Sequence, residues 1–231
     1  MYIPNLSGRN LFSKFHSSEL FCESFCTCNL CGISVFEPWN TFTSFAYILS
    51  AIIISVMSHS IDNISNNLKN LYICSIFILG LGTLLWHGKH ILIFKIIDQI
   101  GMLLTVYTLL LCQVAHSFNI TGILDFLTFK IPLLIIFIYF FQYKIMKYAN
   151  IIFIITIGLN IGFMVYANIY NGLKFDKYSI FGLLSLIIGK ILWIIDKKKI
   201  RPLHHYWHIL TGLSILFFWI SFEYNYTLEL G

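Results

Sequence analysis

Charged residues are scarce in this chain of 231 residues: 15 lysines and arginines and 10 aspartates and glutamates make up 11% of it. Hydrophobic residues contribute 58%, and the mean hydropathy is +0.81. A soluble domain of this composition would expose large apolar patches and aggregate. The scarcity of charge therefore excludes a soluble globular protein and indicates that the lipid bilayer is the solvent.

The sequence also lacks internal repeats and low-complexity linkers, which favours one compact bundle. It has no early apolar stretch followed by a small-residue cleavage site, so we expect no cleaved signal peptide. Inverted repeats and interrupted helices, which are typical of secondary transporters, are not evident either. A transporter is therefore the weakest of the membrane-protein hypotheses.

Long apolar stretches fill most of the chain. A transmembrane helix needs roughly 20 predominantly apolar residues. Seven stretches are long and apolar enough, at about 40–58, 71–87, 91–113, 122–141, 149–169, 178–195 and 204–222. We predict an all-α fold, a single seven-helix transmembrane domain over residues 1–231 in which a segment 1–38 precedes the first span.

The positive charges are distributed unequally between the two sides of this bundle. Nine lie on the side of the N-terminus, and they are Arg9, Lys14, Lys89, Lys144, Lys147, Lys197, Lys198, Lys199 and Arg201. The other side has three, which are Lys69, Lys174 and Lys177. The positive-inside rule predicts a cytoplasmic N-terminus and an external C-terminus. The run "DKKKIRP" is short and indicates orientation or contact with anionic lipid, not nucleic-acid binding.

Four of the six cysteines crowd into "FCESFCTCNLC", at Cys22, Cys26, Cys28 and Cys31. Their spacing fits no standard zinc template. Reduced cytosolic thiols agree with the predicted topology, whereas an N-terminus in an oxidising compartment would favour disulfides.

Polar and ionisable residues recur at one depth of the predicted bundle, near the side of the N-terminus. They are Glu37, Asn40, His87, Asp98, His204 and His208. Such residues are costly within membrane spans and mark sites or buried partners. Residues three, four or seven apart share a helix face, so four helices each direct one polar stripe toward this depth.

Three of these residues form a candidate zinc site. His87, His204 and His208 are imidazoles from two helices, and three histidines with an open fourth position are a common catalytic zinc set. The spacing of four places His204 and His208 on one face. Asp98 is then a candidate general base or orienting group, and the hydroxyl of Thr83 a candidate donor to a developing oxyanion.

Each feature also has a simpler interpretation. A histidine at the membrane interface can be an amphipathic anchor, HxxxH occurs by chance, Glu37 can be an acid at a helix start, and Asp98 can pair with Lys95. Their coincidence at one depth favours a site. The remaining histidines are interpreted as interfacial or loop residues, with at most an orienting role for His205; they are His16, His59, His90, His116 and His205.

Several motifs together resemble the alkaline ceramidase family. They are "EPWNTF" at the first span, "GTLLWH", Asp98 eleven residues after His87, and "HHYWHILTGL" at the last span. The resemblance extends from about residue 20 to the end. It implies the seven-span fold shared with the progestin and adipoQ receptors, zinc held by His87, His204 and His208, and a catalytic aspartate at Asp98. The oxyanion-stabilising serine of the family falls at Thr83, which keeps the hydroxyl.

The resemblance also implies a candidate calcium or structural site. At "FCES" the family has an acidic run that helps to bind calcium together with a glutamate that corresponds to Glu37. Glu23 and Glu37 remain here, and Asn40 shares the stripe of Glu37. Leu or Cys replaces other acidic ligands, so a complete Ca²⁺ site is not expected.

The resulting hypothesis is a membrane-embedded, zinc-dependent amidohydrolase that cleaves ceramide or a related N-acyl lipid to a fatty acid and an amine. The substrate would enter from the bilayer, and no feature indicates an obligate protein partner. The alternative is a receptor-like or haemolysin-like seven-span protein with structural zinc. Those relatives usually have a histidine shortly after the first-span asparagine, and "EPWNTFTSFAYIL" has none.

Overall fold

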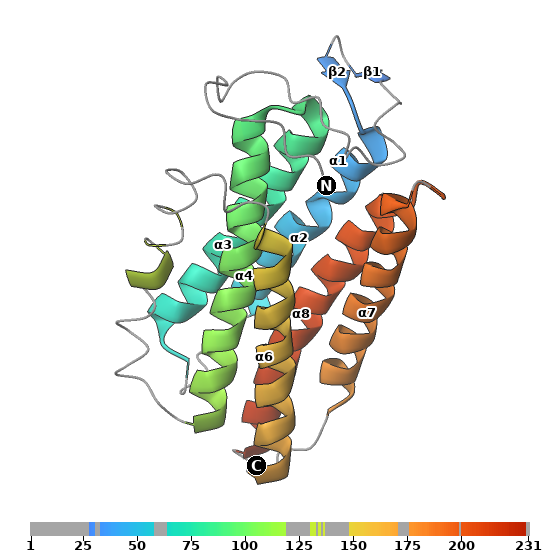
Figure 1. Ribbon diagram of the computed structural model, residues 1–231. Coiled ribbons are helices and arrows are strands. Elements are labelled where there is room, and N and C mark those ends of the chain that lie inside the picture. The colour runs from blue at the N-terminus through green and yellow to red at the C-terminus, as the bar shows by residue number, and fades with distance from the viewer. Residues whose placement is uncertain are drawn as a thin grey trace.

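The computed structural model describes residues 28–30, 33–57, 64–118, 130–132, 134, 136, 148–170, 176–198 and 200–229. These residues form a bundle of helices with one small hairpin at an end (Figure 1). The helices are α1 (Pro38–Thr43), α2 (Phe45–Met57), α3 (Asn66–Lys89), α4 (Leu92–Phe118), α6 (Ala149–Tyr170), α7 (Lys177–Lys197) and α8 (His204–Glu229). Strands β1 (Cys28–Leu30) and β2 (Ile33–Val35) pair antiparallel in the segment that precedes α1.

The helical fold is confirmed, with four candidate membrane spans among the described residues, whereas the count of seven spans stays a prediction. Four segments are long and apolar enough to cross a membrane, namely Pro38–Met57, Asn66–Lys89, Leu92–His116 and Lys177–Lys197. Helices α6 and α8 lie where spans were expected, but the apolar part of α6, Ile151–Tyr166, is shorter. Of the expected span 122–141, only residues 130–132, 134 and 136 are described, and they are helical.

The outer face of α7 shows why this fold needs lipid. Large apolar side chains along this helix are exposed, among them Phe181, Leu184, Ile187, Ile188 and Ile191. In water such a face would aggregate, whereas acyl chains cover it without cost. The inner side of α7 packs against α8.

Close contact between α3 and α4 positions the polar residues of both helices. A Cβ atom on Gly82 would lie 2.5 Å from the backbone nitrogen of Asp98, and one on Gly101 would lie 2.5 Å from the backbone of Leu79. Only residues without a side chain permit this approach, as is common between membrane helices. The two backbones consequently meet where α3 carries Thr83 and α4 carries Asp98.

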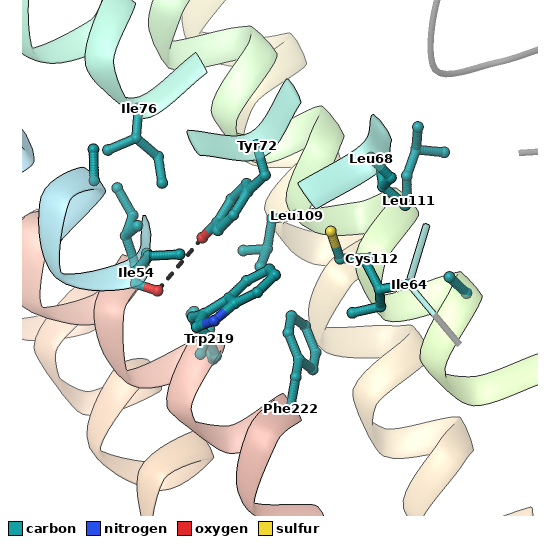
Figure 2. Close-up of a cluster of buried hydrophobic side chains, with 14 of the residues drawn as sticks. Ile54, Ile64, Leu68, Tyr72, Ile76, Leu109, Leu111, Cys112, Trp219 and Phe222 are labelled. Atoms are coloured by element: carbon teal, nitrogen blue, oxygen red, sulfur yellow. Dashed lines mark hydrogen bonds between the residues drawn. The ribbon is translucent and has the colours of Figure 1, made fainter. Parts of the chain in front are cut away.

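A hydrophobic cluster beyond this contact joins α2, α3, α4 and α8 (Figure 2). The rings of Tyr72 and Trp219 stack with centroids 5.5 Å apart and an interplanar angle of 20°. The hydroxyl of Tyr72 donates to the backbone carbonyl of Ile215 at 3.4 Å. Both aromatic residues are buried, so this cluster fixes α8 against α3.

A polar cluster fastens α7 to α8 at the end of the bundle opposite the predicted zinc site. Asp176 caps α7 by accepting from the backbone amides of Tyr178 and Ser179, and its Oδ2 atom accepts from the hydroxyls of Ser179 and Ser221. Partial burial raises the pKa of Asp176, but the hydrogen bonds from Ser221 and Ser179 outweigh this effect and hold the pKa below its ordinary value. The carboxylate therefore stays ionised and keeps α7 in register with α8.

Candidate metal centre

The three histidines that the sequence nominated come together. His87 in the last turn of α3 faces His204 and His208 in the first two turns of α8, and one ligand atom from each lies within 4.8 Å of the others. All three side chains are buried. The ring centroid of His87 lies 5.1 Å from that of His204 and 4.9 Å from that of His208.

In both His87 and His208, Nδ1 is hydrogen-bonded and Nε2 is left to bind a metal ion. Nδ1 of His87 bonds to the carboxylate of Glu37, and Nδ1 of His208 lies 3.0 Å from the backbone carbonyl of Asn40. Carboxylate and carbonyl oxygens only accept, so the hydrogen of each ring must reside on Nδ1. Nε2 of both rings then carries a lone pair, which is the state that a metal ligand requires.

The distance between the two histidines of α8 also suits a shared ion. Nε2 of His204 lies 3.1 Å from Nε2 of His208. Tetrahedral zinc with Zn–N distances of about 2.0–2.1 Å places two of its nitrogen ligands about 3.3 Å apart. The donor set and its spacing therefore fit a divalent transition metal, and zinc is a natural occupant of such a three-imidazole site.

Glu37 is the centre of the network behind His87. Its Oε2 atom accepts from His87 and from the side-chain amide of Asn40, the latter at 2.7 Å, and its Oε1 atom accepts from Nε2 of His90 at 2.8 Å. The carboxylate is 1% exposed. A carboxylate that holds the outer nitrogen of a ligand histidine fixes the ring and increases its basicity.

Backbone contacts bring Glu37 to this position. The amides of Phe36 and Glu37 donate to the carbonyls of Gly88 and His87 at 3.3 and 3.2 Å. These carbonyls belong to the last turn of α3, where helices leave such groups without an internal partner. Pro38 then begins α1, as expected for the first turn of a helix. The start of α1 is thereby attached to the end of α3.

Asp196 positions the other side of the triad. Its Oδ2 atom accepts from the backbone amide of His204 at 2.5 Å, and its side chain is fully buried. The last turn of α7 thus supplies a cap for the first turn of α8, which carries His204 and His208. Sequence reasoning missed this role, although an acid eight residues before a helix start, with Pro202 between them, is a recognisable signal.

Asp98 and Thr83 lie beside the triad and contact each other. The Thr83 hydroxyl is 2.5 Å from Oδ1 of Asp98 and 2.7 Å from the carbonyl of Leu79. The sequence left open whether Asp98 pairs with Lys95. The structure gives its carboxylate the hydroxyl of Thr83 as a hydrogen-bond partner, and Nζ of Lys95 lies 5.4 Å from the ring centroid of Trp86.

The triad, Asp98 and Thr83 line one cavity. Its volume is about 180 Å³, and it is lined by His87, His204, His208, Asp98 and Thr83. Apolar side chains from four helices line the rest of it, among them Leu109, Phe153, Ile157, Leu186 and Phe218. A cavity with a polar end at the histidines and a long apolar part suits an amphiphilic ligand.

His90 is the residue that the sequence analysis undervalued most. It was interpreted as an interfacial or loop histidine, yet it is 5% exposed and stacks against Phe36 and Trp86 with centroids 5.1 and 5.0 Å away. It ends α3 in the left-handed conformation, with φ of 53°. This turn directs its ring back to Glu37. The pair of histidines three residues apart in "WHGKH" was the available signal.

The other histidines and acids have different outcomes. His116 was also interpreted as interfacial or loop; it is the last residue of the candidate span Leu92–His116, but it is helical, and its ring is buried against Phe222. Glu23, His16 and His59 lie outside the described residues. Glu37 and Asn40, nominated for calcium or structure, lie within the network of the triad, and calcium binding stays a prediction.

Comparison with models of known protein families and with curated protein sequences gave no match for the chain. The geometry of this centre and the motifs of the sequence therefore provide the basis for a functional proposal.

Proposed function

We propose that the protein is a membrane-embedded, zinc-dependent amidohydrolase of the alkaline ceramidase type. The observation that carries this proposal is the presence in one cavity of a buried three-histidine centre, a carboxylate and a largely apolar lining. A structural zinc site is normally closed by four protein ligands, whereas three ligands leave a position for water or substrate. The substrate is ceramide or a related N-acyl lipid, and the products are a fatty acid and an amine.

Each residue of the cavity has a part in this reaction. His87, His204 and His208 would hold zinc, which supplies Lewis-acid chemistry by polarising an amide carbonyl and acidifying a water molecule. Asp98 accepts a proton from the attacking water as the C–O bond forms, and it then donates this proton to the amine nitrogen as the amide C–N bond breaks. The Thr83 hydroxyl orients Asp98 and can transfer its hydrogen bond to the developing oxyanion.

The apolar part of the cavity would hold the acyl chain. Leu109, Ile157 and Leu186 lie on helices α4, α6 and α7, so the chain would extend from the histidines toward the middle of the bundle. Burial of each methylene contributes about 0.8 kcal/mol, which makes an acyl chain a large source of binding free energy.

The proposal is tested by metal content and by turnover together. Elemental analysis of purified protein should give one zinc per chain, lost in His87→Ala, His204→Ala and His208→Ala and kept in His116→Gln, a buried histidine outside the centre. Mass spectrometry should then detect fatty acid and sphingoid base from N-oleoyl sphingosine, with the reaction abolished by a chelator and restored by zinc. Full zinc in two of the three alanine variants would refute the centre. Zinc without hydrolysis of any N-acyl lipid would favour the receptor-like alternative.

A further inference from the structure

Two lysines line the cavity of the metal centre. Lys95 comes from the first turn of α4 and Lys197 from the last turn of α7, and both fall within segments that are apolar enough to span a membrane. Both lie at an end of their helix, where a lysine can extend its ammonium group toward the membrane interface. Lys197 is exposed and can contact lipid headgroups, but it lines the same cavity as the partly buried Lys95, so both ammonium groups are also accessible to a ligand of the cavity.

Trp86, Trp193 and Trp207 line the same cavity, and the first two contact these cations. Nζ of Lys95 lies 5.4 Å from the ring centroid of Trp86, and Nζ of Lys197 lies 4.8 Å from that of Trp193. Indole has no lone pair that accepts a conventional hydrogen bond. The rings therefore position the ammonium groups by cation–π contact and form no ion pair with them.

A third lysine, Lys190, contacts two of these tryptophans. Nζ of Lys190 lies 3.7 Å from the ring centroid of Trp193 and 5.5 Å from that of Trp207. Among the described residues that line the cavity, Asp98 is the acidic one, against the two cations Lys95 and Lys197. A bound zinc ion would add further positive charge. The cavity is thus complementary to an anion.

The position of Lys95 indicates which half of a substrate would carry that anion. Lys95 precedes Asp98 by three residues on α4, so the two side chains lie about one helical turn apart on neighbouring positions. Asp98 serves the amine nitrogen in the proposed reaction, and the apolar channel takes the acyl half. A group that reaches Lys95 therefore belongs to the amine half, a few bonds from the amide nitrogen.

We infer that the preferred substrates are N-acyl lipids whose amine half bears an anionic group, a carboxylate or a phosphate, that Lys95 and Lys197 bind. This inference rests on the proposed amidohydrolase function. The anion site would distinguish N-acyl lipids with an anionic amine half from those with a neutral one, which the metal centre alone would hydrolyse equally well.

Two matched pairs of substrates test the inference. N-oleoylglycine and N-oleoylethanolamine share the acyl chain and differ at the end of a two-carbon amine, where one has a carboxylate and the other a hydroxyl. Ceramide 1-phosphate and ceramide form the phosphate pair. We expect kcat/KM to favour the anionic member of at least one pair by about tenfold or more, since hydrogen bonds to charged groups are the stronger kind. The pair with the larger ratio identifies the anion as carboxylate or phosphate.

Lysine variants connect this selectivity to the cavity. Lys95→Met and Lys197→Met keep the length of the side chain and remove its charge, and each should lower the anionic-to-neutral ratio about tenfold. Lys197→Arg should keep most of it. Lys177→Met is the matched control, because Lys177 begins α7 at its opposite end, and it should leave the ratio unchanged. A ratio near one in the wild type, or a ratio that Lys95→Met and Lys197→Met both preserve, would overturn the inference.

A binding measurement separates failure of this inference from failure of the proposed function. The zinc-loaded Asp98→Asn variant is titrated with 9,10-dibromostearoyl glycine and with its ethanolamine counterpart, and quenching of tryptophan fluorescence reports occupancy of the cavity. The anion site is supported if the glycine conjugate binds more tightly than the ethanolamine conjugate and Lys197→Met abolishes this difference. This holds even if no amide is hydrolysed. Hydrolysis without any anionic preference refutes the anion site and leaves the amidohydrolase intact. Phosphatidic acid has no amide. If it competes with the glycine conjugate at equal concentration, the lysines form a general site for anionic lipid, and the inference that they bind the substrate is overturned.

Discussion

The carboxylate of Glu37 accepts the Nδ1 hydrogen of His87 and thereby fixes which nitrogen of this ring faces the metal centre. The second oxygen of the same carboxylate is held by His90, so Glu37 is clamped between two imidazoles. The amide of glutamine has one accepting oxygen and cannot serve both rings. We expect Glu37→Gln to weaken zinc binding by about 10- to 100-fold, because such partners of ligand histidines have effects of that size.

Competition with a chromophoric chelator measures this affinity. Glu223→Gln provides a matched exchange of acid for amide, because Glu223 bonds to Trp219 one turn earlier on α8, far along the helix from His204. It should bind zinc as the wild type does. Wild-type affinity in Glu37→Gln would mean that the carboxylate has no influence on the ligand histidine.

The approach of α3 to α4 at Gly82 gives a second prediction. A methyl group there would lie 2.5 Å from the nitrogen and 2.8 Å from the Cα atom of Asp98, and both are backbone atoms that cannot rotate away. Gly82→Ala must separate the helices, which we expect to cost about 1–3 kcal/mol, as for other overpacked sites. The thermal unfolding midpoint in detergent micelles should fall, and activity per folded molecule should fall with it.

Gly158→Ala is the corresponding control. No atom lies within 4 Å of a Cβ placed on Gly158 in α6, and alanine is the better helix former. Its unfolding midpoint should be unchanged or raised. Equal midpoints for Gly82→Ala and Gly158→Ala would contradict the close packing of α3 on α4.

The orientation of the protein in the membrane is a third prediction. Nine positive charges on the N-terminal side against three on the other predict an external C-terminus. Labelling of a cysteine added after Gly231 with a membrane-impermeant reagent on intact cells should succeed, and labelling at the loop that contains Lys198 should require permeabilised cells. The reverse pattern would show that the charge distribution or the number of spans was misjudged.

The sequence predicted the metal centre better than its surroundings. His204 and His208 share a face because helical geometry is local, and depth in the membrane could be counted from the apolar stretches. The role of Glu37 could not be predicted in this way. It depends on the attachment of Phe36 and Glu37 to the last carbonyls of α3, a contact between segments 50 residues apart.

Other misses have the same physical origin. His90 is buried because it adopts the left-handed conformation at the end of α3. A non-glycine residue rarely does so, and the sequence therefore did not predict it. The contact of Thr83 with Asp98 depends on the closeness of two helices at Gly82, and a small residue alone does not reveal its partner. Helix periodicity sorts faces, but tertiary packing decides which faces meet.

The fourth prediction distinguishes catalysis from scaffolding and concerns Asp98. If its carboxylate only held Thr83, asparagine would keep the shape and a hydrogen bond, and hydrolysis would change little. If Asp98 accepts the proton of the attacking water, asparagine cannot replace it, and general-base catalysis contributes about 10²- to 10⁴-fold in rate. We therefore expect Asp98→Asn to keep zinc and folding while kcat for a fluorescent N-acyl sphingoid substrate falls at least about a hundredfold.

Three further variants complete this test. Asp176→Asn makes the same exchange at a helix cap outside the cavity; it weakens the contact of α7 with Ser221 of α8 and should lower the unfolding midpoint, but the rate per folded molecule should stay at the wild-type value. Thr83→Ser keeps the hydroxyl beside Asp98 and should stay active, whereas Thr83→Ala should lose part of the rate because the oxyanion and Asp98 both lose a donor. A wild-type rate in Asp98→Asn would refute the mechanism, since no other carboxylate among the described residues lines the cavity to take the proton.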